Sequence, residues 1–404
     1  MREGWKEVTI GQLGKVITGN TPPKKDSANY GGVYPFIKPT DMEIDSRHVN
    51  VWEENYSEKA YKRYKNSFIP PRSTGVVTIG TVGEKLFQAD RWCFTNQSVN
   101  VVIPNEKLYD PDFIYYLLKI NLPKVENANP GTASGRHHVS KSNFCAIKVK
   151  LPTNINTQRK IAKILSNYDD LIENNLKRIK ILEEMAQQTY EEWFVRMRFP
   201  GYETTTINET TGLPEGWERV KLGEVCNFSQ GLQVPIEKQF TQFSNELIRF
   251  IRIVDVTQNT NDIRYIESPK SLNQFVHFKD VFMVRYGAPQ VVTNYHGIIA
   301  NNFFRININD ENKLKRKFLF SFLNRNEIKE NLLAMSVSAT MPAISFKSFS
   351  TLDIILPEIE VQAKFHKYVD TTYDLILNLQ NQNQRLREAR DILLPRLMMG
   401  MVEV

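Results

Sequence analysis

The chain has 404 residues, of which 41% are hydrophobic and 24% charged, and its formal net charge is +7. These values are those of an ordinary soluble protein with room for two hydrophobic cores, and the charges that interrupt the longest helical patterns exclude a membrane span. Three isolated cysteines exclude a disulfide framework, and the N-terminal residues lack the apolar core of a signal peptide. We therefore expect a reducing, cytoplasmic setting. The modest basic excess is compatible with nucleic-acid binding, but many proteins without that activity share it.

The first 150 residues show a mixed α/β pattern. Runs of β-prone residues lie between turn clusters and predict strands at residues 33–37, 75–79, 98–103 and 145–149. Asp110-Pro111 predicts the start of a helix that continues to Leu118, because proline is favoured at the first helical position. Residues 1–150 are therefore expected to form one domain.

Two segments of this domain carry side chains suited to nucleic acid. Residues 56–65 alternate tyrosines and cations. The cations would neutralise phosphates, and the tyrosines, Tyr56 among them, would pack on sugars or hydrogen-bond phosphates; the candidates are Lys62, Arg63 and Lys65. Residues 131–141 form a small-residue loop with donors for a DNA groove, at Arg136, His137 and Lys141. Lys38 is a further candidate. A solvated amphipathic helix and an ordinary surface loop are the plain alternatives for the two segments.

A long helix is predicted next, within residues 151–200. Mostly apolar residues recur there at alternating spacings of four and three from Ile161 to Trp193, with Asn175 near the middle. Pro152 precedes this heptad pattern and Pro200 follows it. The polar residues 201–212 then indicate a linker.

The second half of the chain repeats the first. Gly216-Trp217 repeats Gly4-Trp5, and the later elements return in the same order. We therefore expect a second mixed α/β domain at residues 213–355 and a second long helix within residues 356–404. The seam of that helix runs from Phe365 to Leu397, with one central asparagine, one charged exception and a proline at its frayed end, namely Asn383, Arg390 and Pro395.

The segments between the repeated anchors differ between the two halves. Such a pattern is typical of one scaffold that carries two specificities. In the second domain, the side chains suited to base or phosphate contact are Arg252, Arg285, Tyr286, Gln290 and Asn294.

The positions of the two asparagines predict how the helices pair. In a fully overlapped antiparallel pair, Ile161 faces Leu397, and Asn175 faces Asn383, so the two amides meet. A parallel pair would place each asparagine against an apolar residue and leave buried polar groups unpaired, which costs about 1–3 kcal/mol. We predict an α+β protein in which two mixed α/β domains are separated by an antiparallel coiled coil with pseudo-two-fold symmetry. The seam spans roughly 50 Å, or about fifteen base pairs of B-DNA.

Motifs for catalysis are missing from the sequence. The segment 80–85 has the wrong spacing for a phosphate-binding loop, and Glu327 lacks a paired aspartate at nuclease spacing. His137-His138 has no partner at metal-ligand spacing. We expect neither a catalytic residue nor a metal site.

The full chain resembles the specificity subunits of type I restriction–modification systems. The resemblance rests on the repeated Gly-Trp opening, on the motif at residues 35–41, and on Leu151-Pro152 followed by Gln158, which returns as Leu356-Pro357 followed by Gln362. The halves depart from each other after Gly19 and Gly231, where residues 20–22 and 232–235 differ.

This resemblance implies two target-recognition domains, each reading one half of a bipartite, asymmetric site in double-stranded DNA. It also implies a non-catalytic subunit without a cofactor of its own. Two modification subunits would supply adenine methylation with S-adenosylmethionine, and two restriction subunits would supply translocation and cleavage with ATP and Mg. Trp193 and Phe194 are candidates for docking the modification subunits, and an apolar end plug is the alternative.

Two other classes of function stay open on the residues alone. A self-contained methyltransferase or nuclease would act without partners. A structural scaffold would not bind DNA, and neutralising the charges of Lys62, Arg63 and Lys65 would leave its activity unchanged.

Overall fold

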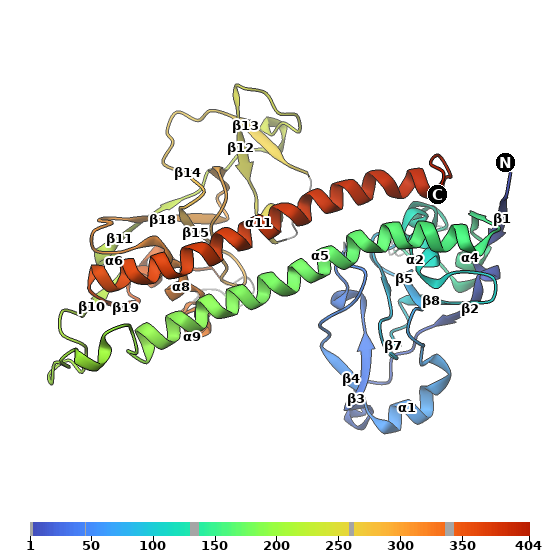
Figure 1. The fold of residues 1–404 in the computed structure, drawn as a ribbon, viewed down its shortest axis with the longest axis horizontal. Coiled ribbons are helices and arrows are strands. Elements are labelled where there is room, and N and C mark those ends of the chain that lie inside the picture. The colour runs from blue at the N-terminus through green and yellow to red at the C-terminus, as the bar shows by residue number, and fades with distance from the viewer. Residues whose placement is uncertain (1–2, 45, 130–136, 258–261, 336–342) are drawn as a thin grey trace. The chain divides into compact units, whose positions relative to one another are not determined.

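The computed structural model describes the chain apart from residues 1–2, 45, 130–136, 258–261 and 336–342. Tertiary contacts divide the chain into two compact units, which we call unit 1 (Met1–Lys177 with Asn381–Val404) and unit 2 (Arg178–Gln380). Each unit combines a β-rich part with portions of both long helices, α5 (Ile155–Tyr190, green in Figure 1) and α11 (Ile359–Met398, red). Each unit is thus built from both halves of the chain.

The described strands of unit 1 form three sheets. A two-stranded antiparallel sheet joins β1 (Trp5–Thr9) and β9 (Lys148–Pro152). A four-stranded sheet has the order β2 (Gly14–Thr18), β8 (Val99–Pro104), β5 (Thr74–Val77), β6 (Leu86–Gln88). A three-stranded sheet has the order β4 (Glu54–Tyr56), β3 (Tyr30–Ile37), β7 (Phe94–Thr95), and its β3–β7 pair is parallel.

Helix α2 (Pro111–Ile120) connects these sheets to the long helices. Asp110 caps it by accepting hydrogen bonds from the backbone N–H groups of Asp112 and Phe113, and this confirms the predicted helix start. The apolar side chains of α2 pack in one core with Leu165 and Leu397. The shorter helices of unit 1 are α1 (Glu58–Tyr64), α3 (Leu122–Asn127) and α4 (Lys141–Ala146).

Unit 2 repeats this topology, with one additional strand, β14 (Phe275–Val276), in its third sheet. A two-stranded sheet joins β10 (Glu218–Lys221) and β19 (Asp353–Leu356). A four-stranded sheet has the order β11 (Cys226–Gln230), β18 (Phe303–Ile308), β15 (Val281–Val284), β16 (Val291–Val292). Another has the order β13 (Arg264–Glu267), β12 (Leu247–Ile251), β17 (Gly297–Ile299), β14 (Phe275–Val276). The helices of its β-rich part are α6 (Leu222–Val225), α7 (Ile253–Thr257), α8 (Arg316–Asn324), α9 (Asn326–Ala334) and α10 (Phe346–Ser350).

A buried glutamine anchors each long helix in the same way. The Gln158 amide donates to the Pro152 carbonyl (2.9 Å) and accepts from the Asp110 backbone N–H (3.0 Å). The Gln362 amide donates to the Pro357 carbonyl (2.9 Å) and accepts from the Lys315 backbone N–H (2.9 Å). The sequence repeat is therefore also a repeat of specific contacts, with Gln158 equivalent to Gln362.

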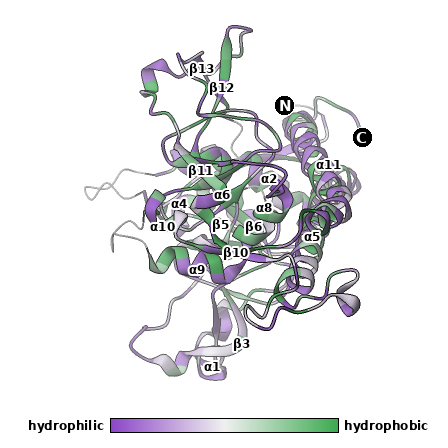
Figure 2. Cartoon of the chain, turned by 90° about the vertical axis from the view of Figure 1, so that its left-hand side faces the viewer, coloured by the Kyte–Doolittle hydropathy of each residue, from purple (hydrophilic) through white to green (hydrophobic). Residues whose placement is uncertain are grey.

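The long helices pair antiparallel inside each unit. In unit 1, α5 contacts α11 through Asn175 and Asn383. In unit 2, the rings of Trp193 and Phe365 lie 5.8 Å apart, so the predicted register is confirmed in both units. Figure 2 shows hydrophilic and hydrophobic residues along both helices, as expected of amphipathic helices that pack on one face.

One sequence-based boundary was wrong, and so was the description of one helix end as frayed. The strand predicted at residues 145–149 begins at Lys148, because Cys145 and Ala146 belong to α4, whose start is capped by the Ser140 hydroxyl. Pro395 lies inside α11, which continues to Met398 because Leu397 and Met398 pack in the core of unit 1. In the part of the chain that the structure describes, no helix is long and apolar enough to cross a membrane.

Candidate nucleic-acid interface

The tyrosines and the cations of residues 56–65 point in different directions. Tyr56 is fully buried and donates its hydroxyl hydrogen to the Asn20 carbonyl (2.6 Å). Tyr61 stacks on Tyr34 with ring centroids 4.5 Å apart, inside an aromatic cluster around Phe36. The interpretation of Tyr56 as a sugar or phosphate contact was therefore wrong, because this ring belongs to the core.

The cations of this segment are exposed. Lys62 and Arg63 lie on α1, and Lys65 lies in the 3-10 turn that follows it. The Lys62 ammonium is 3.9 Å from Glu58, a weak surface pair, and the Arg63 guanidinium lies 5.4 Å from the Tyr64 ring centroid. Lys62, Arg63 and Lys65 therefore present positive charge to solvent.

Lys38 and Arg252 occupy equivalent positions in the two units and are both neutralised by acids. The Lys38 ammonium lies 2.6 Å from Glu53, and the Arg252 guanidinium lies 2.8 Å from Asp255. Burial, the largest single influence, lowers the pKa of both cations, but the hydrogen bonds and negative charges of the neighbouring acids together outweigh it, so each pKa is raised. Both side chains are mostly buried, and their first partners are within the protein.

A polar row leads from the strand ends of unit 1 to an exposed turn. The Thr18 hydroxyl donates to the Asn100 amide oxygen (2.6 Å), and the Asn100 amide donates to the Thr78 hydroxyl (3.0 Å). Gly80 follows at φ +91°, with open space where a Cβ would lie, and its N–H donates to the His137 carbonyl (3.0 Å). His137 and Lys141 are exposed beside this turn, whereas Arg136 lies outside the described residues.

Unit 2 has the same turn with different side chains. The Arg285 N–H donates to the Asn302 carbonyl (2.7 Å), as the Thr78 N–H donates to the Ser98 carbonyl (2.8 Å). Gly287, at φ +82°, then takes the place of Gly80. Tyr286 and Gln290 belong to this β15–β16 connection, and Asn294 follows β16 at φ +68°. The backbone frame is thus shared, and a buried threonine is replaced by a half-buried arginine.

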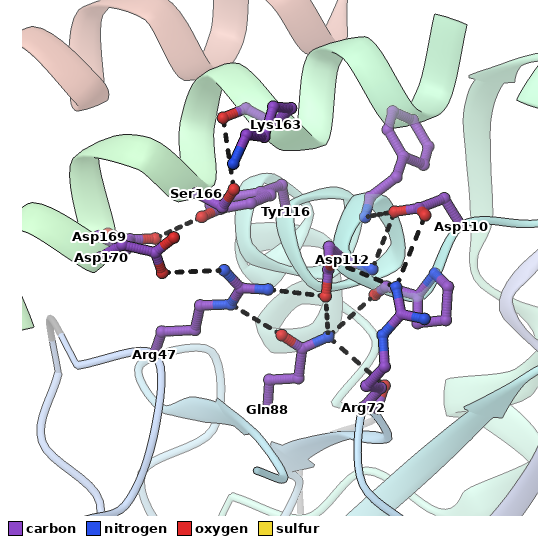
Figure 3. A network of polar contacts seen from close by, with 12 residues as sticks. Arg47, Arg72, Gln88, Asp110, Asp112, Tyr116, Lys163, Ser166, Asp169 and Asp170 are labelled. Atoms are coloured by element: carbon purple, nitrogen blue, oxygen red, sulfur yellow. Dashed lines mark hydrogen bonds and ion pairs between the residues drawn. The ribbon is translucent and has the colours of Figure 1, made fainter. Parts of the chain in front are cut away.

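A polar network around Arg47, drawn in Figure 3, was missed in the sequence. The Arg47 guanidinium donates to the Gln88 amide oxygen and to Asp112 (both 2.7 Å), and it lies 3.9 Å from Asp170 of α5. Arg72 pairs with the other oxygen of Asp112 (3.2 Å). The network lines a polar cavity of about 550 Å³. It ties the segment before β4 to α2 and α5, and no periodic signal marks these residues.

Two polar layers lie in the buried seam of the helix pair. The Asn175 amide donates to the Asn383 amide oxygen (2.9 Å), so the predicted contact is confirmed. Arg390, fully buried, donates to Asp169 (2.7 Å), which also accepts from the Tyr116 hydroxyl (2.6 Å). Burial and the negative charge of Asp169 raise the pKa of Tyr116. Arg390, an apparent imperfection of the heptad pattern, is half of a buried ion pair.

Of the two docking candidates, Trp193 is half-buried and Phe194 is buried. The Trp193 ring contacts Phe365 and the exposed Tyr368 ring, with centroids 5.8 and 6.0 Å apart. Phe194 is 4% exposed and packs on Phe318 in the core of unit 2. Phe194 therefore fits the alternative given for it, an apolar side chain that packs at the end of the long helix rather than a docking residue.

Among the described residues, no group of three or more His, Cys, Asp or Glu side chains lies close enough together to bind a metal ion. Glu327 lies on helix α9 and pairs with Arg325. The geometry is that of exposed cations and polar turns on rigid sheets, which suits recognition of a surface.

The sequence profile of the family described as "Type I restriction modification DNA specificity domain" matches residues 2–184 and 214–388. These two matches cover most of the chain and one match falls in each half of the repeat. The chain belongs to this family. It is a specificity (S) subunit of a type I restriction–modification system.

Relatives that match most of their length support the assignment. The MjaIX specificity subunit of Methanocaldococcus jannaschii is 26% identical over 99% of this chain and 94% of its own length. The HindI specificity subunit of Haemophilus influenzae is 22% identical over 74% of this chain and 79% of its own length. The crystal structure of an S subunit from M. genitalium shares the fold, with a TM-score of 0.57, 17% identity, and coverage of 97% and 96% of the two chains.

S subunits are the non-catalytic specificity subunits of type I restriction enzymes and form part of a complex that acts on DNA. In this S subunit, the two matched domains correspond to the two halves whose strand order and glutamine contacts repeat.

Proposed function

We propose that this S subunit binds double-stranded DNA and that its two recognition domains, residues 1–150 and 213–355, each read one half of a bipartite, asymmetric site. One observation carries the proposal: the two units share strand order and turn geometry, while the side chains on the shared frame differ, as at Thr78 and Arg285. Similar frames present a similar surface to two DNA segments, and different side chains select different bases.

In the first domain, the exposed cations Lys62, Arg63 and Lys65 contact phosphates, and the turn around Gly80 faces a groove with Arg136, His137 and Lys141. In the second domain, Arg285, Tyr286, Gln290 and Asn294 act from the equivalent turn. Phosphate contacts position the domain and base contacts specify the sequence. Lys38 and Arg252 have acidic partners of their own, so their share in DNA binding requires exchange of those partners for phosphates.

The complex is proposed to contain two modification and two restriction subunits and to act in the cytoplasm. The modification subunits hold S-adenosylmethionine, and the restriction subunits use ATP and Mg, so this subunit needs no cofactor. Trp193, with its exposed neighbour Tyr368, offers the modification subunits an aromatic surface at one end of the helix pair, and Phe194 supports that surface from the core.

Methylome sequencing of the host with and without this gene tests the proposal. We expect one bipartite motif with adenine methylation to disappear on deletion and to return on complementation. An unchanged methylome in a host whose modification subunits are active would refute it.

A further inference from the structure

The two polar layers of the helix seam lie at positions that the repeat does not conserve between halves. The equivalence of Gln158 and Gln362 aligns α5 with α11 at a constant offset of 204 residues, which is the difference between their printed numbers. At that offset Asn175 corresponds to Leu379, and Ile179 corresponds to Asn383. Each helix therefore carries one asparagine, but at different positions.

The buried ion pair is also divided between the halves. Asp169 of α5 corresponds to Tyr373 of α11, and Arg390 of α11 corresponds to Ala186 of α5. In unit 2, the equivalent seam residues, Tyr373 and Ala186, carry no charge of their own: Tyr373 is 8% exposed, its hydroxyl lies 3.4 Å from that of Ser321, and the Lys317 ammonium lies 4.1 Å from its ring centroid. Across the seam, the acid Asp169 thus comes from the first helix and the cation Arg390 from the second, where Arg390 also pairs with its neighbour Asp391 (2.8 Å).

Pairing between like halves would break both layers. In two copies of α5 with the same geometry, Asn175 would face Ile179 of the other copy, and Asp169 would face Ala186. In two copies of α11, Asn383 would face Leu379 and Arg390 would face Tyr373. Each like pair contains every mismatch twice. A buried amide without its partner is unfavourable, and so is a buried charge that loses its partner across the seam, although Arg390 keeps Asp391 and Asp169 keeps the Tyr116 hydroxyl.

We propose that the seam makes the two halves of this chain selective partners, so that each accepts the other and rejects a second copy of itself. The surface involved is the apolar stripe of each helix, and Asn175, Asn383, Asp169 and Arg390 set the choice. This consequence rests on the proposed function: a subunit with unlike halves presents two different recognition domains and reads an asymmetric site. The choice of partner itself is independent of DNA.

Co-expression of the two halves as separate chains tests this selectivity. The exposed turn at residues 209–211 is the place to divide the protein, since Asn208 closes that turn locally. The N-terminal half is produced with two different affinity tags, together with the C-terminal half. Purification through one tag is expected to recover the C-terminal half. The N-terminal half with the other tag should be recovered at less than about one hundredth of that amount, because each of two unpaired asparagines disfavours the like pair by on the order of tenfold. Recovery of the second tag in statistical proportion, or no association of the halves, would overturn the proposal.

A variant with the seam exchanged tests the cause. In the variant with Ile179→Asn and Asn383→Leu, two N-terminal halves would pair an asparagine at position 175 with one at position 179, and would do so twice. In the unlike pair, both asparagines would face leucine. Like pairs are expected to rise at least tenfold. Ile172→Asn is the matched control, because its seam position meets Leu182 in the like pair and Leu386 in the unlike pair, so it creates no new match. An unchanged partner choice in the exchanged variant would remove the asparagine layer as the cause. Since the readout contains no DNA, its failure is distinguishable from failure of the methylome test.

Discussion

Replacing one asparagine of the seam is expected to destabilise the helix pair more than replacing both. Asn175→Leu removes the 2.9 Å partner of Asn383, which is 2% exposed, and an unsatisfied buried amide costs about 1–3 kcal/mol. We expect the lower half of that range, because the Asn383 amide nitrogen has no hydrogen-bond partner among the described residues even before the change. Asn383→Leu is expected to cost a similar amount.

The double variant brings two leucines together in the same layer. Burial of each leucine contributes about 1.5–3 kcal/mol, against about 0.5–1.5 kcal/mol for the lost neutral hydrogen bond. The double variant should therefore match or exceed the parent in stability, with a coupling energy of about 2–3 kcal/mol between the two sites.

Hydrogen exchange measured by mass spectrometry over residues 168–182 and 376–390 reports this layer directly, and urea unfolding followed by circular dichroism reports the whole chain. Gln384→Leu, on the exposed side of α11, is the matched control and should change stability by less than about 0.5 kcal/mol. Additive single changes, or a double variant less stable than either single one, would refute the paired polar layer.

Four further outcomes are expected. Glutamine substitution of Lys62, Arg63 and Lys65 should weaken DNA binding by the assembled complex at every sequence. Titration at several salt concentrations should show the slope of log K against log salt reduced by up to about 0.9 per lost phosphate contact, and Lys180→Gln should leave binding unchanged. Burial raises the pKa of Cys93 to about 12, so its thiol is almost entirely protonated at pH 8, and a thiol reagent should label the half-buried Cys145 first. The raised pKa also predicts that the contribution of Cys93 to stability is complete below pH 9 and is lost as the pH rises towards 12. Arg47→Met should lower the free energy of unfolding of unit 1 by about 2–3 kcal/mol, less than for a fully buried pair because Asp112 is 31% exposed, and an unchanged urea midpoint would contradict this.

The elements predicted best were those with a strong local signal. The heptad spacing predicted both long helices and their register, because buried asparagines tolerate few partners. Asp110-Pro111 predicted α2, because capping is decided within four residues. The strand at residues 145–149 was misplaced, since the apolar run crosses from α4 into β9 and only pairing with β1 fixes its start at Lys148.

The candidate site was less predictable, because it depends on contacts between distant residues. Basic character alone does not distinguish exposed Lys62 from Arg252, which is held by Asp255 and Asp262. Arg47 meets Asp112 and Asp170 only after three separate segments of the chain have folded together. The Arg390–Asp169 pair had a signal, a charge at a seam position, but its partner lay 221 residues away.

The sequence by itself determined the duplication, the α+β class, the two amphipathic helices and the layer in which Asn175 meets Asn383, because periodicity and polar burial are local and pairwise constraints. The tertiary structure decided which half supplies each part of a compact unit, which cations keep free charges, and which tyrosines belong to a core. Those outcomes depend on side chains brought together from distant parts of the chain, where burial and charge pairing compete, and no local pattern records the result.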